Sequence, residues 1–165
     1  MTLRDYRPED FDRLCEIDRL CFPPGIAYTA EEMRLYIADR RTFTIVVEEP
    51  EHRIVGFLIA RLEPGRRGAR VGHLVTIDVH PDQQGRGIGS RLLREAERRL
   101  RQAGARAIFL ETAVDNHGAI RFYEKHGYRV LKRIRGYYLG EMDAFRMGKA
   151  LEPTRSTGTA CRAPS

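Results

Sequence analysis

A glycine-rich turn lies in the middle of the chain, in the run Gln84-Gly85-Arg86-Gly87-Ile88-Gly89. An apolar segment ending at Val79 precedes it and a long amphipathic segment follows, so the run predicts a strand–turn–helix junction. The first N–H groups of a helix have no acceptor within the helix, and the helix dipole adds partial positive charge there. Glycine has no Cβ that would hold a ligand away from the backbone. The main-chain amides of this turn are therefore predicted to bind an anion such as a phosphate group.

Two side chains beyond the turn could move protons. Glu111 lies near the C-terminal end of the apolar segment Ala107–Thr112, where a buried carboxylate is costly unless it has a partner or a chemical task. Tyr123 lies in the next predicted helix. A carboxylate suits a general base and a phenol suits a general acid. The structural alternatives are a salt bridge at the strand end for Glu111 and core packing beside Phe122 for Tyr123.

The elements that must position these residues can be read from the hydrophobic pattern. Strands are predicted over Thr2–Tyr6, Thr42–Glu48, Ile54–Arg61, Arg70–Val79, Ala107–Thr112, about 128–136 and about 143–151. Helices are predicted over about 9–20, from Thr29 onward, along the segment after Gly87, and over His117–His126. Thr29 followed by Glu32 forms a capping box at the start of the second helix.

This order of elements predicts the α/β class, with one twisted mixed sheet and helices on both faces. An antiparallel run of strands comes first, and strand–helix–strand–helix–strand follows. A right-handed crossover through the long helix makes the strands before and after it parallel neighbours. The ligand should then lie beyond the C-terminal end of the strand that leads into the glycine turn.

Length and composition fit one domain over residues 1–152, because 165 residues lie near the common size of a single domain. Residues 153–165 are rich in Pro, Thr, Ser and Gly and are predicted to be disordered. No apolar run approaches the roughly 20 residues of a membrane span, and the N-terminus lacks the apolar core of a secretion signal. The three cysteines, Cys15, Cys21 and Cys161, lack the spacing of metal ligands, and an odd number leaves one without a disulfide partner. We therefore expect a cytoplasmic protein with neither a metal nor a membrane partner.

The net charge of +6 is concentrated around the long helix, where seven arginines and two glutamates lie between Arg86 and Arg106. One face of this helix is predicted to be basic, with Arg91, Arg94, Arg98 and Arg101. The opposite, core-facing stripe is Ile88, Leu92, Ala96, Leu100 and Ala103. Such a field would attract a polyphosphate ligand. No aromatic residues alternate with these arginines, so the pattern does not favour a nucleic-acid partner.

Three blocks between Thr76 and Leu151 together resemble the GNAT acetyltransferases, in particular the ribosomal-protein alanine N-acetyltransferase branch. The first is the Gln84–Gly89 run, which resembles the cofactor motif of the family. The second is Phe109-Leu110-Glu111-Thr112, then Asn116, then the run from Ala119 to Tyr128. The third is Gly136-Tyr137-Tyr138 followed by Asp143-Ala144-Phe145-Arg146-Met147.

The resemblance implies a GNAT-like fold of about seven strands and about four helices, with acetyl-CoA as co-substrate. It implies that the pantetheine arm contacts the backbone of Ile77, Asp78 and Val79, with an N–H near Val79 close to the thioester carbonyl. The pyrophosphate would be held by Gly85, Arg86, Gly87, Ile88, Gly89 and Ser90. Asn116 would contact the cofactor, although it fits a helix N-cap equally well. Asp78 stands where the family usually has a small neutral residue.

The resemblance also implies a reaction. Glu111 would deprotonate an amine that attacks acetyl-CoA directly, and Tyr123 would protonate the departing thiolate; His73 is an alternative base. Tyr137 and Tyr138 would enclose the acceptor, or else pair as strand aromatics. The expected acceptor is a protein N-terminal α-amine, whose reference pKa of about 7.7–8.0 is below the roughly 10.4 of lysine. The alternatives are lysine, a small-molecule amine, or a CoA-responsive binding module without turnover.

Overall fold

The structure is a computed structural model that describes residues 1–153, so the predicted tail lies outside it except for Pro153. Within these residues the strands are β1 (Thr2–Asp5), β2 (Thr42–Glu48), β3 (Ile54–Pro64), β4 (Arg70–Val79), β5 (Ala105–Ala113), β6 (Arg129–Tyr138) and β7 (Met142–Ala150). The α-helices are α1 (Phe11–Cys21), α2 (Ala30–Ala38), α3 (Ile88–Gln102) and α4 (His117–Lys125). Short 3-10 turns are η1 (Pro8–Asp10), η2 (Pro50–His52), η3 (Arg66–Gly68) and η4 (Pro81–Gln83).

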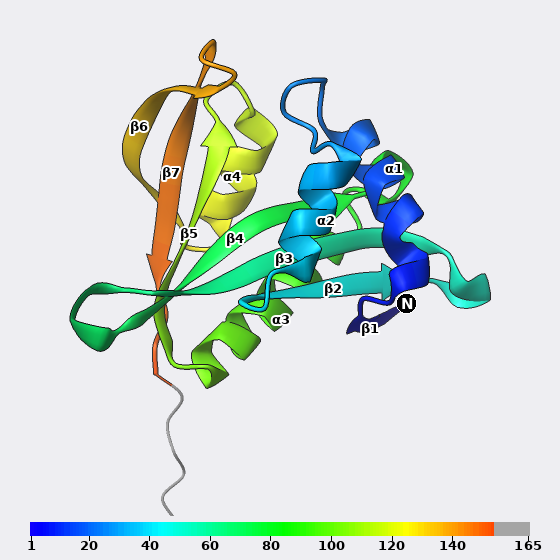
Figure 1. Ribbon diagram of the computed structural model, residues 1–165, viewed down its shortest axis with the longest axis horizontal. Helices are drawn as coiled ribbons and strands as arrows, with labels where there is room; N and C mark the ends of the chain where they lie inside the picture. Colours follow the sequence, from blue (N-terminus) through cyan, green and yellow to red (C-terminus); the bar gives the residue numbers. More distant parts are fainter. Residues whose placement is uncertain (154–165) are drawn as a thin grey trace, which may run out of the picture.

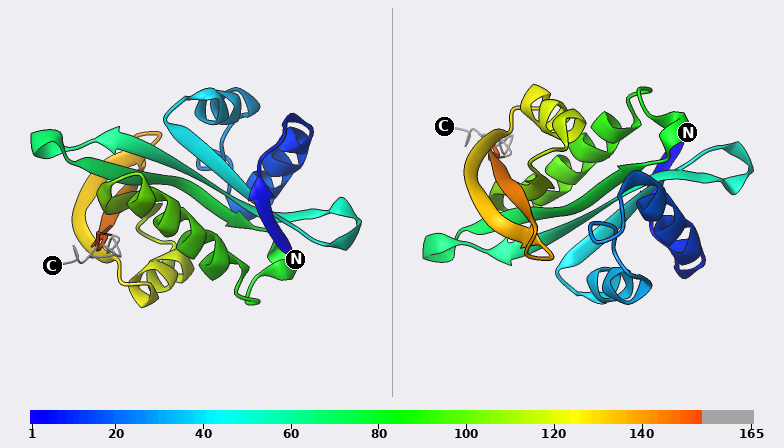
Figure 2. Two further views of the ribbon diagram at one scale, coloured as in Figure 1. Left: turned by 90° about the horizontal axis from the view of Figure 1, so that it is seen from below. Right: turned by 90° about the horizontal axis from the view of Figure 1, so that it is seen from above.

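All seven strands form one mixed sheet in the order β1-β2-β3-β4-β5-β7-β6. Among the strands of residues 1–153, only β4 and β5 pair in parallel, and α3 connects them as the predicted crossover (Figure 1). Helices α3 and α4 cover one face of the sheet, while α1 and α2 cover the other (Figure 2). The predicted α/β class and mixed sheet are therefore confirmed.

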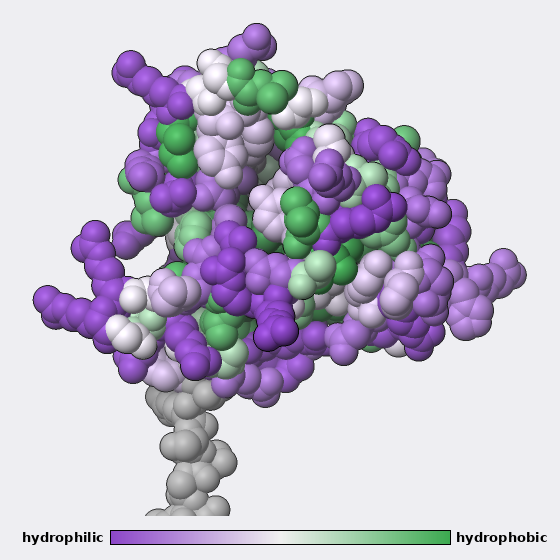
Figure 3. All heavy atoms as spheres, viewed as in Figure 1, coloured by the Kyte–Doolittle hydropathy of each residue, from purple (hydrophilic) through white to green (hydrophobic). Residues whose placement is uncertain are grey.

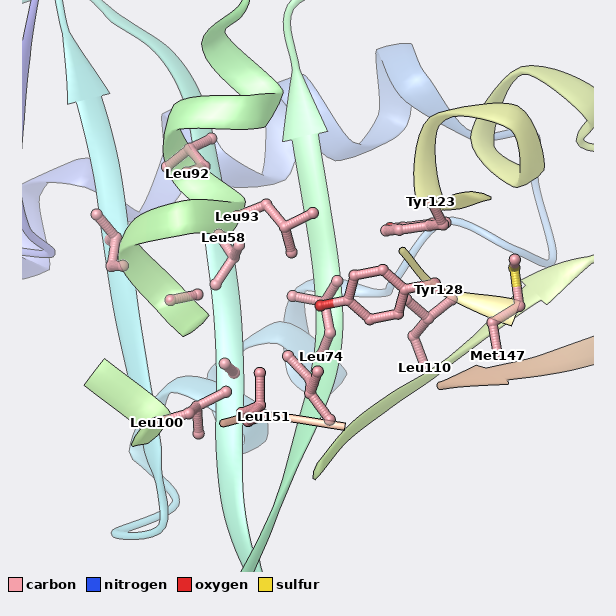
Figure 4. Packing of buried hydrophobic residues seen from close by; sticks show 14 of the residues in the cluster. Leu58, Leu74, Leu92, Leu93, Leu100, Leu110, Tyr123, Tyr128, Met147 and Leu151 are labelled. Carbon is pink, nitrogen blue, oxygen red and sulfur yellow. The ribbon is translucent and has the colours of Figure 1, made fainter. Parts of the chain in front are cut away.

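Each face of the sheet has its own hydrophobic core. Leu92 and Leu100 of α3 and Tyr123 of α4 pack on β3, β4 and β5 on one side (Figure 4). Leu14 and Ile17 of α1 and Met33 of α2 pack on β2 and β3 on the other. The predicted apolar stripe of α3 is buried except for Ala103, which is exposed because the helix ends at Gln102 and Ala103 is its C-cap.

The predicted capping box at the start of α2 is present. The Thr29 hydroxyl accepts the Glu32 N–H at 3.1 Å, and the Glu32 carboxylate accepts the Thr29 N–H at 3.4 Å. These two bonds satisfy backbone donors that the first turn of a helix leaves unpaired. They fix the point at which the connection after α1 turns into α2.

The face shown in Figure 3 is mainly hydrophilic, with hydrophobic side chains scattered among the polar ones. Large exposed hydrophobic residues include Leu20, Leu35, Val130, Leu131 and Leu139. Over residues 1–153, none of the helices has the length and apolar character to cross a membrane. The same residues contain no group of three His, Cys, Asp or Glu side chains arranged to bind a metal ion.

Two leucine-to-alanine variants test this account of the core. Leu92 on α3 is fully buried, whereas Leu35 on α2 is 68% exposed. Leu92→Ala should lower the free energy of unfolding by about 2–5 kcal/mol, because it leaves a cavity in the core. Leu35→Ala should change it by less than about 0.5 kcal/mol. Urea unfolding followed by circular dichroism measures both, and equal losses would contradict the assignment of the core face.

Candidate functional site

Strands β4 and β5 separate partway along their length. Their pairing ends at His73 and Phe109, yet β4 continues to Val79 and β5 continues to Ala113. Beyond this point β5 keeps β7 on its other edge, while β4 stays paired with β3. Figure 1 shows the two strands diverging, with α4 beside the opening. The last part of β4 therefore has no strand partner on its β5 side.

The β3–β4 register identifies which groups of β4 face this opening. Pairing jumps from Ile59–Thr76 to Ala60–Leu74, so Val75 is an extra, bulged residue. The His80 N–H donates to the Val55 carbonyl at 2.8 Å, which marks a hydrogen-bonded pair. Hydrogen-bonded and non-hydrogen-bonded pairs alternate along antiparallel strands. The N–H groups of Ile77 and Val79 therefore point away from β3 and into the opening.

The same alternation directs the backbone of Asp78 toward β3. Its side chain is 1% exposed and lies against Asp18 of α1, away from the core formed with α3. Of the three β4 residues that the sequence predicted as cofactor contacts, two face the opening. The geometry does not support Asp78 as a direct contact.

The glycine turn lies directly beyond the end of β4. Gly85 and Gly87 have φ values of +77° and +80°, in the left-handed region that favours glycine. Gly87 is the N-cap of α3, and no side chain caps the helix there. The first intrahelical bond runs from Arg91 N–H to the Gly87 carbonyl, so the N–H groups of Ile88, Gly89 and Ser90 have no acceptor within the helix.

Neighbouring side chains hold this turn in place. The Gln84 side-chain amide donates to the Val79 carbonyl at 3.0 Å, and the Arg86 guanidinium donates to the side-chain oxygen Oε1 of Gln83. A Cβ on Gly89 would lie 3.4 Å from the Phe122 ring of α4. The turn is thus fixed to both β4 and α4, with its free amides grouped at the end of the opening.

Asn116 is the N-cap of α4, as the structural alternative predicted. Its side-chain oxygen accepts the Ala119 N–H at 3.1 Å. This bond uses the oxygen and leaves the side-chain NH₂ group available, so capping does not exclude contact with a ligand.

Glu111 is the centre of a hydrogen-bonded group that links three strands. One carboxylate oxygen lies 2.7 Å from His73 Nε2 on β4. The other accepts from Arg146 of β7, at 2.8 Å from Nη2 and 3.1 Å from Nε. Burial alone would raise the Glu111 pKa, but the hydrogen bonds and charges of His73 and Arg146 outweigh burial and lower it. The carboxylate is therefore ionised at neutral pH.

Further charged groups orient His73. Its ring stacks on Phe109 at 4.5 Å, and its Nδ1 lies 3.4 Å from Arg61 Nη2 and 3.8 Å from Glu63 Oε1. Both ring nitrogens therefore have polar neighbours, and neither is left free for an incoming amine. This makes His73 a partner of Glu111 rather than an independent base.

Tyr123 lies in the core beside the opening, with 7% of its surface exposed. Its ring meets those of Phe122 and Tyr128 edge-on, so the predicted packing role is real. Within residues 1–153 the Tyr123 hydroxyl makes no hydrogen bond. It is nevertheless not one of the side-chain oxygens that are both closed off from solvent and without a hydrogen-bond partner. The hydroxyl is therefore reachable from solvent. Burial, followed by Asp78 and Tyr138, raises its pKa well above the ordinary value, so it stays protonated.

Two tyrosines of β6 lie near Glu111, and two further tyrosines lie beside them. Tyr137 and Tyr138 at the end of β6 lie edge-on at 4.9 Å. Burial, followed by the Glu111 charge, raises the Tyr137 pKa to about 12. Tyr28 and Tyr36 pair at 5.1 Å and lie close to Tyr137. The predicted acceptor-binding tyrosines are thus brought to Glu111.

The two loops that adjoin Tyr28 and Tyr138 in the sequence are in contact. The α1–α2 loop (residues 22–29) contains Gly25 with φ +90°, and the β6–β7 turn (residues 139–141) contains Leu139 with φ +53°. A Cβ on Gly25 would lie 2.7 Å from Leu139 Cδ1, so the loops are in contact. Leu139 is nevertheless 78% exposed. Leu139 is thus an exposed non-glycine residue in the left-handed region, a conformation that costs backbone free energy.

Cys21 lies nearer to the opening than its sequence context indicated. Its thiol donates to the Val79 carbonyl at 3.2 Å. Burial, followed by the nearby Asp78, raises its pKa to about 12, so it remains a protonated thiol. Only a thiolate is an effective nucleophile. Cys15 is buried, and burial raises its pKa as well.

Sequence reasoning missed the roles of Arg146, Tyr28 and Asp18, and it gave His73 only as an alternative base. Arg146 lies inside a block that the sequence singled out, and its charge opposite a buried Glu111 was a usable signal. Tyr28 and Asp18 offered none, because their partners become apparent only from the packing of α1 on β4.

The chain is similar in sequence to known acetyltransferases. The Acetyltransferase (GNAT) family profile matches residues 11–128. The chain is 30% identical over 158 residues to an N-alpha-acetyltransferase of Saccharolobus solfataricus, covering 91% of this chain and 93% of that protein. It is 30% identical over 119 residues to N-alpha-acetyltransferase 30 of Schizosaccharomyces pombe, covering 72% and 79%.

Solved structures share the fold. Naa20 of Chaetomium thermophilum, crystallised with a bisubstrate analogue, superposes with a TM-score of 0.78 at 26% identity, covering 92% of this chain and 87% of that one. The ribosomal-protein-S18-alanine N-acetyltransferase of Escherichia coli superposes with a TM-score of 0.79 at 21% identity, covering 94% and 97%. At that identity the likeness concerns the fold.

Gly87 and Gly68 provide a matched test of the anion site. Both have positive φ and open space where a Cβ would lie, but Gly68 belongs to the turn between β3 and β4. Gly87→Val and Gly68→Val should both lower stability by about 1–3 kcal/mol through backbone strain. Only Gly87→Val should weaken acetyl-CoA binding, by at least about tenfold in Kd. Isothermal titration calorimetry measures this, and normal affinity in Gly87→Val would show that the turn is not the phosphate site.

Proposed function

The chain belongs to the acetyltransferase (GNAT) family, and on that premise we propose that it transfers the acetyl group of acetyl-CoA directly to the N-terminal α-amine of a protein. Its family and its similarity to N-alpha-acetyltransferases identify it as an acyltransferase. The proposal assigns the acceptor class and a task to each residue at the opening between β4 and β5.

The observation that carries the proposal is the row of unpaired main-chain donors along one edge of that opening. It begins with the Ile77 and Val79 N–H groups and continues through the uncapped amides at the start of α3. An unpaired backbone donor is costly unless a ligand or water satisfies it. Such a row suits a long ligand with amide carbonyls at one end and a diphosphate at the other, as acetyl-CoA has.

Within this row the residues have separable tasks. The amides from Gly85 to Ser90 bind the pyrophosphate, and the side-chain NH₂ of Asn116 adds a contact from α4. Ile77 and Val79 hold the pantetheine arm. The bound co-substrate supplies a thioester as the activated acetyl group. A fixed N–H near Val79 is placed to stabilise negative charge that develops on the thioester carbonyl, a contribution of roughly 3 kcal/mol for one such donor.

Glu111 is the proposed base. Its ionised carboxylate is held by His73 and Arg146, so its position does not depend on the substrate. It accepts the proton of the attacking amine, directly or through one water. The lowered pKa makes it a weak base, which is sufficient for an α-amine near neutral pH and less so for a lysine.

Tyr123 is the proposed acid. It remains protonated at neutral pH, and its hydroxyl is reachable although the ring is buried. It donates a proton to the departing CoA thiolate. Glu111 and Tyr123 belong to opposite faces of the sheet, because Tyr123 packs with α3 whereas Glu111 bonds to His73 and Arg146 beside the tyrosines near α2. Only the gap between β4 and β5 gives a single reacting group access to both.

Attack within a ternary complex is favoured over a covalent acetyl-cysteine route. Within residues 1–153 both cysteines are thiols of raised pKa, and Cys21 already donates to the Val79 carbonyl. A protonated, hydrogen-bonded thiol would have to lose its proton in a buried place before it could attack.

The loop contact favours a chain terminus as acceptor. Gly25 and Leu139 bring the two loops together over the tyrosines beside Glu111, so an acceptor has to enter end first. Tyr137 and Tyr138 can then bond the backbone of the first residues while their rings narrow the entrance. Lysine and small-molecule amines are the competing acceptors. A binding module without turnover has no need of the ordered Glu111 group.

Glu111→Gln tests the base. The amide keeps the size of the side chain but cannot accept the proton, so kcat should fall by about 10²–10⁴-fold. The Kd for acetyl-CoA should stay within about threefold of the unchanged protein, because Glu111 lies outside the phosphate turn. Glu124→Gln on the exposed side of α4 is the matched control and should keep full activity. Unchanged turnover in Glu111→Gln would remove Glu111 from the mechanism.

The acceptor class is tested with a peptide panel and mass spectrometry. Peptides with a free α-amine should gain one acetyl group, and blocking that amine should abolish the gain. Replacing every lysine in the same peptides by arginine should change the rate by less than about threefold, because the α-amine is the reactive group. Acetylation that survives the block and disappears with the lysines would select the lysine alternative. CoA release that does not depend on an amine would contradict transfer.

A further inference from the structure

Two buried carboxyl groups lie together on the α1 side of β4. Asp18 of α1 is 0% exposed and Asp78 of β4 is 1% exposed. One oxygen of each has a partner: Asp18 Oδ2 accepts the Tyr28 N–H at 2.7 Å, and Asp78 Oδ1 accepts the Thr76 hydroxyl at 2.5 Å. The remaining oxygens, Asp18 Oδ1 and Asp78 Oδ2, are the only sealed side-chain oxygens without a donor in residues 1–153.

A single proton explains both orphan oxygens at once. Two ionised carboxylates placed side by side in a buried site repel each other and cannot both stay charged. If one carries a proton, its O–H donates to the other and both orphans are satisfied. Burial, followed by the charge of Asp18, raises the pKa of Asp78 well above its ordinary value. Burial also raises the pKa of Asp18, but bonds from Asp78 and the Tyr28 N–H oppose this, so Asp78 holds the proton.

The neighbouring groups do not replace that proton. The charged residues that act on Asp18 from the packed helices are Arg19 of α1, which favours ionisation, and Glu32 of α2, which opposes it. The other titratable neighbours are the Cys21 thiol and the Tyr28 and Tyr123 hydroxyls, and burial raises the pKa of each. None of these groups donates to either orphan oxygen.

We propose that Asp18 and Asp78 share one proton and that this acid pair fixes the α1–α2 loop to β4, thereby positioning the loop for the acceptor peptide. The structural part of the proposal stands on the two orphan oxygens. The assignment to peptide binding rests on the function proposed above. Both are positioning residues, because neither is placed to touch the reacting atoms.

The pair connects the two halves of the site. On the loop side, Asp18 holds the Tyr28 backbone, and the Tyr28 hydroxyl donates to the carbonyl of the bulged Val75 at 3.2 Å. On the strand side, Asp78 lies between Ile77 and Val79, whose N–H groups face the co-substrate. Cys21, which ends α1, bonds to the Val79 carbonyl. The bridging proton thus links the α1–α2 loop, on the acceptor side, to β4, on the co-substrate side.

The shared proton predicts a pH dependence of folding with a definite sign. In the unfolded chain both aspartates are ionised above about pH 5, whereas the native protein retains one proton. The native state therefore binds more protons, and stability falls as the pH rises toward the raised native pKa. Asp78→Asn removes this dependence, because the asparagine NH₂ donates to Asp18 without a titratable proton while its oxygen still accepts from Thr76.

The first experiment is urea unfolding of the full chain from pH 5 to 8 without substrate. The unfolding constant of the unchanged protein, divided by that of Asp78→Asn, should rise about tenfold per pH unit until the native pair loses its proton. Asp18→Asn should behave like Asp78→Asn, so either variant suffices if the other folds poorly. Asp12→Asn, an exposed position on the same helix, should run parallel to the unchanged protein. Parallel curves for Asp78→Asn and the unchanged protein would overturn the shared proton.

The second experiment separates positioning from general stability. At pH 7, Asp78→Ala should raise the KM for an acceptor peptide at least about tenfold, with the acetyl-CoA Kd within about threefold. Asp78→Asn should restore the KM. An unchanged KM in Asp78→Ala, or an equal defect in Asp78→Asn, would overturn the loop-positioning role. Because unfolding is measured without substrate, the shared proton can be established even if the proposed acetyl transfer fails.

Discussion

The divergence of β4 from β5 is the constraint on which the rest of the structure depends. Parallel strands normally pair along their whole overlap, but here the pairing ends at His73 and Phe109. β5 keeps β7 on its other edge throughout, while the extra residue Val75 bends β4 away. Main-chain donors that would have been satisfied in the sheet are left for a ligand. A site built from backbone in this way needs little from side-chain identity beyond glycines at the turn.

The opening matters because it interrupts a sheet that, over residues 1–153, separates two cores. Helices α3 and α4 define the side on which the phosphate turn and Tyr123 lie. Helices α1 and α2 define the side with the tyrosines and the loop contact. On the proposed function, a thioester placed in the gap would meet a proton donor from one side and an amine with its base from the other, so the two substrates would approach from different faces.

Electrostatics divides the buried acids into two kinds. Glu111 is kept ionised by His73 and Arg146, whereas Asp78 is kept neutral by burial and by its neighbour Asp18. The same sheet thus supports a carboxylate that can accept a proton and a carboxylic acid that can bridge two elements. The two carboxyl groups differ in ionisation because strand register places different neighbours beside them. A buried carboxyl group needs either a nearby cation or a bound proton.

The sequence by itself determined the elements, their order and the glycine turn that leads into α3. These features depend on short-range signals: the hydrophobic period, the capping box at Thr29, and the glycines at 85 and 87. Each signal acts over a few residues, so the helix, strand or turn that it favours depends little on the rest of the fold. Motif blocks also indicated Glu111, Tyr123 and the two tyrosines of β6 as one site. The predicted boundaries of β2 and β4 agree with the structure, while Ala103, at the end of α3, was wrongly assigned to the core.

Only the tertiary structure decided which polar groups meet. His73 and Arg146 are 38 and 35 residues from Glu111, and they reach it because of the order β4-β5-β7. Asp18 meets Asp78 because the bulge at Val75 shifts the side-chain alternation of β4, and a shift of one residue moves a side chain to the other face. Such pairings depend on strand register and helix docking, which are properties of the whole sheet. No local pattern in the chain encodes them.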